Sequence, residues 1–202
     1  MNKYSHIMIG ELIYEYIKKE HGIHLEKESF IRGNVIPDFS YYAIAHPHFM
    51  KLSLGYVQAE IESLSNTYVE SALIGSNYSL RLGIICHYYA DFFCFAHSSG
   101  YKQVVVNHLK YEHLLYKYFQ DNFDSIAQMK LAFSGNIGRN ADEINEKMKS
   151  LHAEYTNTEP SYSEDLNYAL LACAETILSL TYCSSKLISE EPLENYSKAA
   201  AV

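Results

Sequence analysis

The chain has 202 residues, 48% of them hydrophobic, so it is long enough to bury one core and too short to make two domains the expectation. Its 16 Lys and Arg against 24 Asp and Glu give a net charge of −8, which disfavours binding to duplex nucleic acid or to an anionic membrane surface. The length therefore predicts one domain over residues 1–202. The net charge leaves a small phosphate-bearing substrate possible, provided that positive charge is supplied locally.

Apolar residues recur at spacings of three and four along most of the chain, which predicts helices and no convincing strand. The first predicted helix runs from about His6 to Lys19, and a short second one runs from Glu26 to Arg32 and ends at Gly33. The segment GNVIPDFSYYAIAHPHF follows. Its Gly, Pro and Asn predict irregular structure.

Five further helices are predicted after this segment, over residues 50–64, 79–95, 102–119, 140–155 and 164–189. Asn140 followed by Glu143 forms a capping box at the start of one, and Ser163 is the expected cap of the last. The predicted fold class is all-α, a single-domain bundle of many helices.

Targeting signals are not expected in this sequence. The apolar residues near Met1 are interrupted by charges and no small-residue cleavage site follows them, so a secretory signal is not predicted. Every long apolar run elsewhere contains a charge or Gly, which predicts that no segment spans a membrane. The expected location is the cytoplasm. The four cysteines form no CxxC pair and are predicted to be buried free thiols.

The stretch HYYADFFCFAH carries two histidines and an aspartate among aromatic residues. Residues four apart on a helix point the same way, so His87 and Asp91 form a two-ligand clamp. His108 and Glu112 repeat this clamp on another predicted helix, and His97 lies between the two. A single such pair is more often a satisfied core pair than a metal site, but that interpretation does not easily explain two pairs together with further candidates.

Three more candidates lie upstream: His6 in the first helix, Asp38 in the PDF turn and His48 in HPHF. His46 competes with His48, because the two flank Pro47. Imidazoles and carboxylates without accompanying thiolates suit zinc or another borderline divalent metal in an open, catalytic type of site. A dication would also compensate the buried carboxylates and hold the imidazoles neutral.

The order of these motifs, His6, GNxxPD, HF, HYYAD, FAH and HLKYE, resembles the zinc-dependent phospholipase C family over roughly the first 115 residues. That family is related to single-strand nucleases of fungi and plants that have the same trinuclear zinc site. The resemblance implies an all-α bundle with a metal cluster in a cleft between helices.

Carried over by motif, the resemblance implies one zinc held by Asp38, His48, His87 and Asp91, and a second held by His97, His108 and Glu112. Asp91 would bridge the first zinc to a third, which His6 also ligates. In the secreted enzymes a processed N-terminal tryptophan completes that third site. This sequence has no Trp, so two zinc ions are expected and the third site is empty, altered or closed by Met1.

The predicted function is a zinc-dependent phosphodiesterase or phospholipase C-like hydrolase, acting on a small phosphodiester or a phospholipid headgroup. Asp38 resembles the family's proposed general base, although a metal ligand can have the ligand role alone. The alternative is a non-catalytic, metal-stabilised helical module of the same fold. A nuclease is disfavoured by the net charge and by the absence of a Trp to stack on a base, and an HD-type phosphohydrolase would need an adjacent His-Asp pair, which the sequence lacks.

Overall fold

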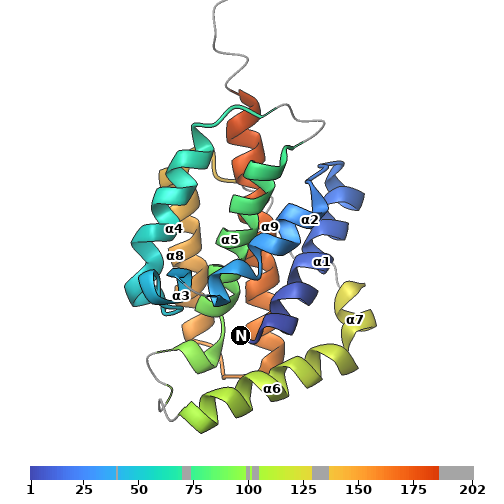
Figure 1. Ribbon diagram of the computed structural model, residues 1–202, viewed down its shortest axis with the longest axis vertical. Helices are drawn as coiled ribbons and strands as arrows, with labels where there is room; N and C mark the ends of the chain where they lie inside the picture. Colours follow the sequence, from blue (N-terminus) through green and yellow to red (C-terminus); the bar gives the residue numbers. More distant parts are fainter. Residues whose placement is uncertain (40, 70–73, 99–100, 102–104, 129–136, 187–202) are drawn as a thin grey trace, which may run out of the picture.

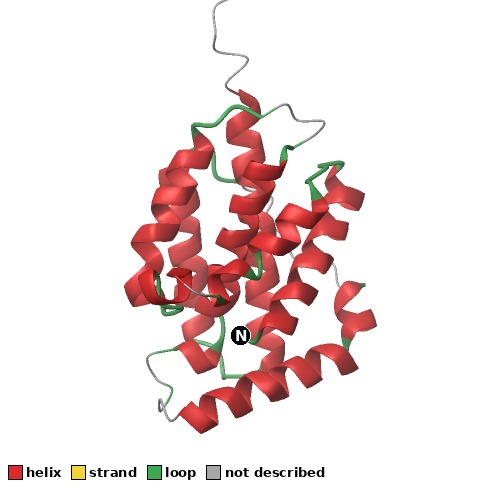
Figure 2. Ribbon diagram, viewed as in Figure 1, coloured by secondary structure: helices red, strands yellow, loops and turns green. Residues whose placement is uncertain are grey.

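The computed structural model describes residues 1–186 apart from residues 40, 70–73, 99–100, 102–104 and 129–136 (Figure 1). Over this described part the protein is helical, and its one β-contact is an isolated bridge between Leu25 and Ile74 (Figure 2). The predicted all-α fold class is confirmed.

In chain order the elements are α1 (Lys3–His21), α2 (Lys27–Gly33), the 3-10 helix η1 (Ile36–Asp38), α3 (Tyr41–Ala45), α4 (Met50–Ser65), α5 (Ser76–Phe92), the 3-10 helix η2 (Phe95–His97), α6 (Val105–Asp121), α7 (Phe123–Ala127), α8 (Ala141–Thr156) and α9 (Tyr162–Lys186). Every predicted helix is present, with its described ends shifted by less than one turn. The start predicted at residue 102 and the end predicted at residue 189 lie outside the described residues.

The structure differs from the sequence-based prediction at two short helices and one helix cap. The helix α3 forms inside the segment predicted to be irregular, because the Gly, Asn and Pro residues flank it and do not interrupt it. The helix α7 was not predicted. The predicted cap Ser163 is wrong: it lies inside α9, and the Ser161 hydroxyl instead accepts from the Glu164 N–H at 3.1 Å. The other predicted cap is confirmed, since the Asn140 side chain accepts from the Glu143 N–H at 2.9 Å.

The helix α5 forms the centre of the bundle, and α2, α4 and α9 pack around it (Figure 1). Its residues are buried on all sides from Leu82 to Phe92, including His87 and Asp91. The helix α6 crosses one end of the bundle, close to the N-terminus of the chain (Figure 1). This arrangement places the polar groups of α5 at the end that α1 and α6 cover.

The helix α9 qualifies the expectation that no segment approaches a membrane span. Its stretch Tyr162–Ser185 is long and apolar enough to cross a membrane by length and composition, with a mean hydropathy of 1.2 in its most apolar window. Of that window 67% is buried inside the protein. Core helices of soluble proteins share this character, because a helix that is apolar all round is covered by its neighbours.

Two glycines let α2 and α5 cross in backbone contact. A Cβ atom added to Gly33 would overlap the main-chain oxygen of Leu80, and one added to Gly83 would overlap that of Phe30. Both obstacles are backbone atoms, so neither can move aside without separating the helices. The close crossing holds Asn34, the residue that follows α2, against the centre of α5.

Gly83→Ala is therefore expected to destabilise the protein by about 3 kcal/mol, the upper end of overpacking costs, and to lower the unfolding midpoint by about 6 to 12 °C. Thermal unfolding followed by circular dichroism measures this. The matched control is Gly55→Ala in α4, where an added Cβ meets nothing within 4 Å. That variant should gain about 0.5 to 1 kcal/mol. Equal midpoints for Gly83→Ala and the wild type would contradict the close crossing.

Candidate metal centre

The structure gathers all eight site residues predicted from the sequence into three groups at the end of the bundle. Within each group the candidate ligand atoms lie within 4.8 Å of one another. The groups are His6, His87 and Asp91; Asp38, His48 and His87; and His97, His108 and Glu112. Their role as metal ligands stays a prediction, but six separate segments of the chain bring them together.

The structure also separates the two histidines that compete in the sequence. His48 joins the group of Asp38 and His87. The ring of His46 instead stacks on Tyr56, with the ring centroids 3.9 Å apart and the planes 16° from parallel. His48 is therefore the better candidate ligand of the two.

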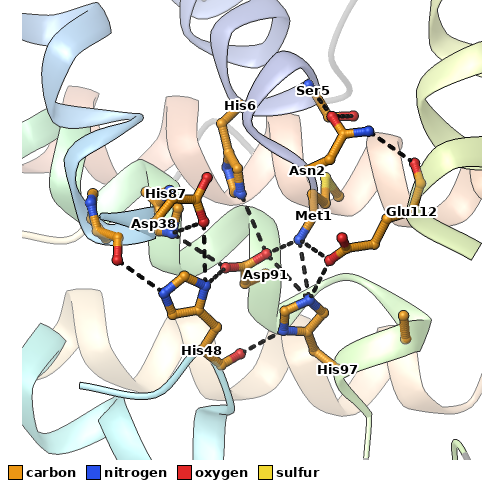
Figure 3. Close-up of polar contacts among 12 residues, drawn as sticks. Met1, Asn2, Ser5, His6, Asp38, His48, His87, Asp91, His97 and Glu112 are labelled. Carbon is orange, nitrogen blue, oxygen red and sulfur yellow. Dashed lines mark hydrogen bonds and ion pairs between the residues drawn. The ribbon is translucent and has the colours of Figure 1, made fainter. Parts of the chain in front are cut away.

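Asp91 lies at the centre of the site, and each of its oxygens faces a different side (Figure 3). Oδ2 lies 2.9 Å from His48 Nδ1 and 3.3 Å from His87 Nε2. Oδ1 lies 3.4 Å from His6 Nε2 and 3.6 Å from His97 Nε2. One carboxylate therefore contacts residues of all three groups; that it bridges the first and third zinc ions, as the family resemblance implies, stays a prediction.

The Met1 α-amine is buried in the same place. It contacts Asp91 Oδ1, and it lies 3.2 Å from Glu112 Oε1 and 3.1 Å from His97 Nε2 (Figure 3). Burial alone lowers the pKa of this amine, but Asp91 and Glu112 outweigh burial and raise it to about 12. A protonated amine has no free electron pair, so a metal ion at this position would have to displace the proton.

Main-chain carbonyls orient four of the site histidines. Three rings donate Nδ1–H and turn Nε2 toward a candidate metal group: His87 to Asn34 at 2.9 Å, His97 to His48 at 2.8 Å and His108 to Ala96 at 3.1 Å. The ring of His48 is reversed, because Nε2–H donates to the Pro37 carbonyl at 3.2 Å and Nδ1 faces Asp91. Metal-ligating histidines almost always make such a hydrogen bond with the nitrogen that does not bind the metal. Sequence reasoning missed these carbonyls, because a backbone acceptor leaves no mark on residue type.

Several buried polar atoms of the site lack a hydrogen-bond partner. They are both ring nitrogens of His6, Nε2 of His87, Oδ2 of Asp38 and Oδ2 of Asp91, the last of which has only its ion pairs with His48 and His87. An unpaired buried polar atom costs about 1 to 3 kcal/mol, so such atoms are rare unless a ligand satisfies them. Imidazole nitrogens and carboxylate oxygens are ligands that zinc accepts. The residues present therefore fit a zinc cluster.

The protonation states also fit metal binding. Burial and a neighbouring imidazole lower the pKa of His6 to about 3, and burial lowers the pKa of His97. Burial works to raise the pKa of Asp91, but the Met1 amine and His97 outweigh burial and hold it well below its usual range. Likewise the Met1 amine holds the pKa of Glu112 at about 2 against the effect of burial. At pH 7 His6 and His97 are thus neutral and Asp91 and Glu112 ionised, which is the state that binds metal. His48 differs: burial works to lower its pKa, but Asp91 and Asp38 outweigh burial and raise it, so a metal ion there would displace a proton more readily held.

The site has a closed inner part and a partly exposed edge. The side chains of His6, His87 and Asp91 are fully buried. The side chains of Asp38 and His48 are 18% and 16% exposed, and that of His108 is 24% exposed. The parts of the centre that solvent touches are therefore Asp38, His48 and His108.

Comparison with known proteins identifies one family. The family model described as zinc dependent phospholipase C matches residues 5–162, more than half of the chain. The matched range contains all eight residues of the three groups. No curated protein and no solved structure matches the chain.

Proposed function

The chain belongs to the zinc-dependent phospholipase C family, as its motifs predict, and on that premise we propose that it hydrolyses phosphodiester bonds with zinc ions held at this centre. The observation that carries the proposal is the convergence of eight imidazole and carboxylate side chains on three adjacent groups, two of which share His87, with Asp91 in contact with residues of all three. A phosphodiester carries negative charge, and the net charge of −8 favours a centre in which bound cations stabilise it.

Each group is assigned one role in metal binding. His97, His108 and Glu112 would hold one zinc, Asp38, His48 and His87 with Asp91 a second, and His6 with Asp91 a third. When bound, zinc neutralises charge on the phosphoryl oxygens and lowers the pKa of a water molecule. The Met1 amine contacts Asp91 and also lies beside Glu112 and His97, so a metal ion at the third position or at the group of His97 would have to displace its proton or the amine itself. Two zinc ions per chain remain the expectation from the motifs.

Asp38 is the residue that we assign to proton transfer. It is partly exposed, whereas Asp91 is fully buried, and one of its oxygens has no hydrogen-bond partner. Burial raises its pKa above the ordinary value, which makes it a better proton acceptor than a fully solvated carboxylate. The Asp38 carboxylate would orient the attacking water and take its proton, while His48, on the same exposed edge, lines the approach of the phosphate.

We propose a small phosphodiester or a phospholipid headgroup as the substrate class. We propose the cytoplasm as the location of the protein. The net charge of −8 supports a small substrate over duplex nucleic acid, because a long polyanion would be repelled beyond the range of the bound cations. The headgroup itself is left to experiment.

The protein loaded with zinc is expected to hydrolyse a nitrophenyl-phosphocholine ester, with activity abolished by a chelator and restored by added zinc. Release of nitrophenol measures the rate, and diesters of ethanolamine, inositol and nucleotides complete the panel. The chelator-treated protein before zinc is restored is the control.

The same panel separates a second candidate function, a metal-stabilised module without catalysis. That candidate is favoured by the complete burial of His6, His87 and Asp91, which no substrate reaches. Full zinc occupancy without hydrolysis of any diester would reject the enzyme and support the module.

A further inference from the structure

A buried carboxylate that belongs to none of the three groups lies behind one of them. Asp165, in the first turn of α9, is 0% exposed and outside the range that the family model matches. It accepts three hydrogen bonds: from the Phe95 main-chain N–H at 3.1 Å, the Tyr111 hydroxyl at 3.0 Å and the Tyr155 hydroxyl at 2.7 Å. Buried carboxylates are costly, so three donors on one acid indicate a specific role.

Two of those donors belong to the segments that carry the group of His97, His108 and Glu112. Phe95 is the first residue of η2, which ends at His97. Tyr111 immediately precedes Glu112 on α6 and lies less than one turn after His108. The Oδ2 atom of Asp165 accepts from both segments. One atom therefore joins the backbone that positions His97 to the helix that positions the other two residues.

The distances inside the group depend on that connection. Glu112 Oε1 lies 3.0 Å from His97 Nε2, across the boundary between the two segments, and 3.1 Å from His108 Nε2 within α6. Because α6 crosses the end of the bundle (Figure 1), a small tilt of this helix would move two of the three residues away from His97.

Aromatic rings close this region from solvent. The ring of Tyr111 packs on those of Phe95 and Tyr162, with centroids 5.9 Å and 4.9 Å apart. Burial raises the pKa of Asp165 to about 6, against the effect of its three donors. The carboxylate is thus mainly ionised at pH 7, which strengthens each bond that it accepts.

We propose that Asp165 is a positioning residue: by holding η2 and α6 together, it fixes the spacing of His97, His108 and Glu112 and so sets the zinc affinity of this group. The inference rests on the proposed zinc centre. Residues that hydrogen-bond a metal ligand typically change the metal affinity about 10- to 100-fold when they are replaced. Asp165 acts one step further out, through chain neighbours of the ligands, so the lower end of that range, about 10-fold, is expected.

Two hydroxyl deletions test the proposal. Tyr111→Phe removes the bond between Asp165 and α6, whereas Tyr155→Phe removes a similar bond to α8, which carries no residue of the metal groups. Zinc titration against a chromophoric chelator should show one site weakened about 10-fold or more in Tyr111→Phe, and a change below about twofold in Tyr155→Phe. Asp165→Asn should resemble Tyr111→Phe, and the absorption spectrum of the cobalt-substituted protein should change in both.

The site affected is identified in a His108→Ala background, where Asp165→Asn should weaken the remaining sites no further. Equal losses in Tyr111→Phe and Tyr155→Phe, or a loss spread over all sites, would show that Asp165 only stabilises the core and would overturn the inference. If the wild type binds zinc and Asp165→Asn binds it equally well, the inference fails and the proposed function stands. If the wild type binds no zinc at this group, both fail.

Discussion

Adding zinc to the metal-free protein is expected to raise its unfolding midpoint by about 8 to 16 °C for each site filled at 1,000 times its dissociation constant. The reason is linkage: an ion that binds the folded chain alone stabilises it by about 4 kcal/mol at that ratio. For a chain of this length each kcal/mol shifts the midpoint by about 2 to 4 °C. Calorimetry with and without a chelator measures the shift, and elemental analysis of the same samples gives the number of ions, expected to be at least two per chain.

Asp91→Asn should lose most of this gain, because the amide keeps the size of the carboxylate but not the charge that connects the groups. It also leaves the buried Met1 amine without its closest acid. The matched control is Asp142→Asn on the exposed surface of α8, which should bind zinc as the wild type does and lose only the helix-dipole contribution of a first-turn acid, about 0.3 to 1 kcal/mol. An Asp91→Asn protein with wild-type zinc content and midpoint, with and without chelator, would rule out Asp91 as the residue that connects the metal groups.

Asp38→Asn is expected to retain zinc and lose hydrolytic activity by about 100-fold or more, the usual contribution of a general base. Asn keeps the size and one oxygen of the side chain but cannot take a proton. Turnover of the nitrophenyl ester and zinc content are to be measured on the same preparation. Loss of one zinc together with the activity would assign Asp38 to the ligand role alone.

A matched pair of variants, His46→Ala and His48→Ala, tests which of the two histidines beside Pro47 belongs to the metal centre. His46→Ala should retain zinc and activity, because the His46 ring packs on Tyr56 outside the metal groups. His48→Ala should lose both. The opposite result would show that His46 is the ligand and that the loop before α4 is arranged differently.

Local pattern was sufficient for the longer helices and for the pairs of site residues within them, but not for the five-residue helices α3 and α7. The position of His87 and Asp91 four residues apart on one helix follows from helix geometry alone, and the same holds for His108 and Glu112. The cap at Asn140 is equally local, since donor and acceptor are three residues apart. Such features can be predicted because the chain between the interacting groups is short and regular.

Tertiary structure decided which local features meet. The central position of Asp91, the choice of His48 over His46 and the carbonyl of Asn34 behind His87 all depend on how α1, α2, α4 and α5 pack. Asp165 shows most clearly what could not be predicted from local sequence. In the sequence it is an acid in the first turn of a helix, a common place for a solvated residue that complements the helix dipole. Its burial and its three donors depend on segments 10 to 70 residues away, which only the folded chain brings together.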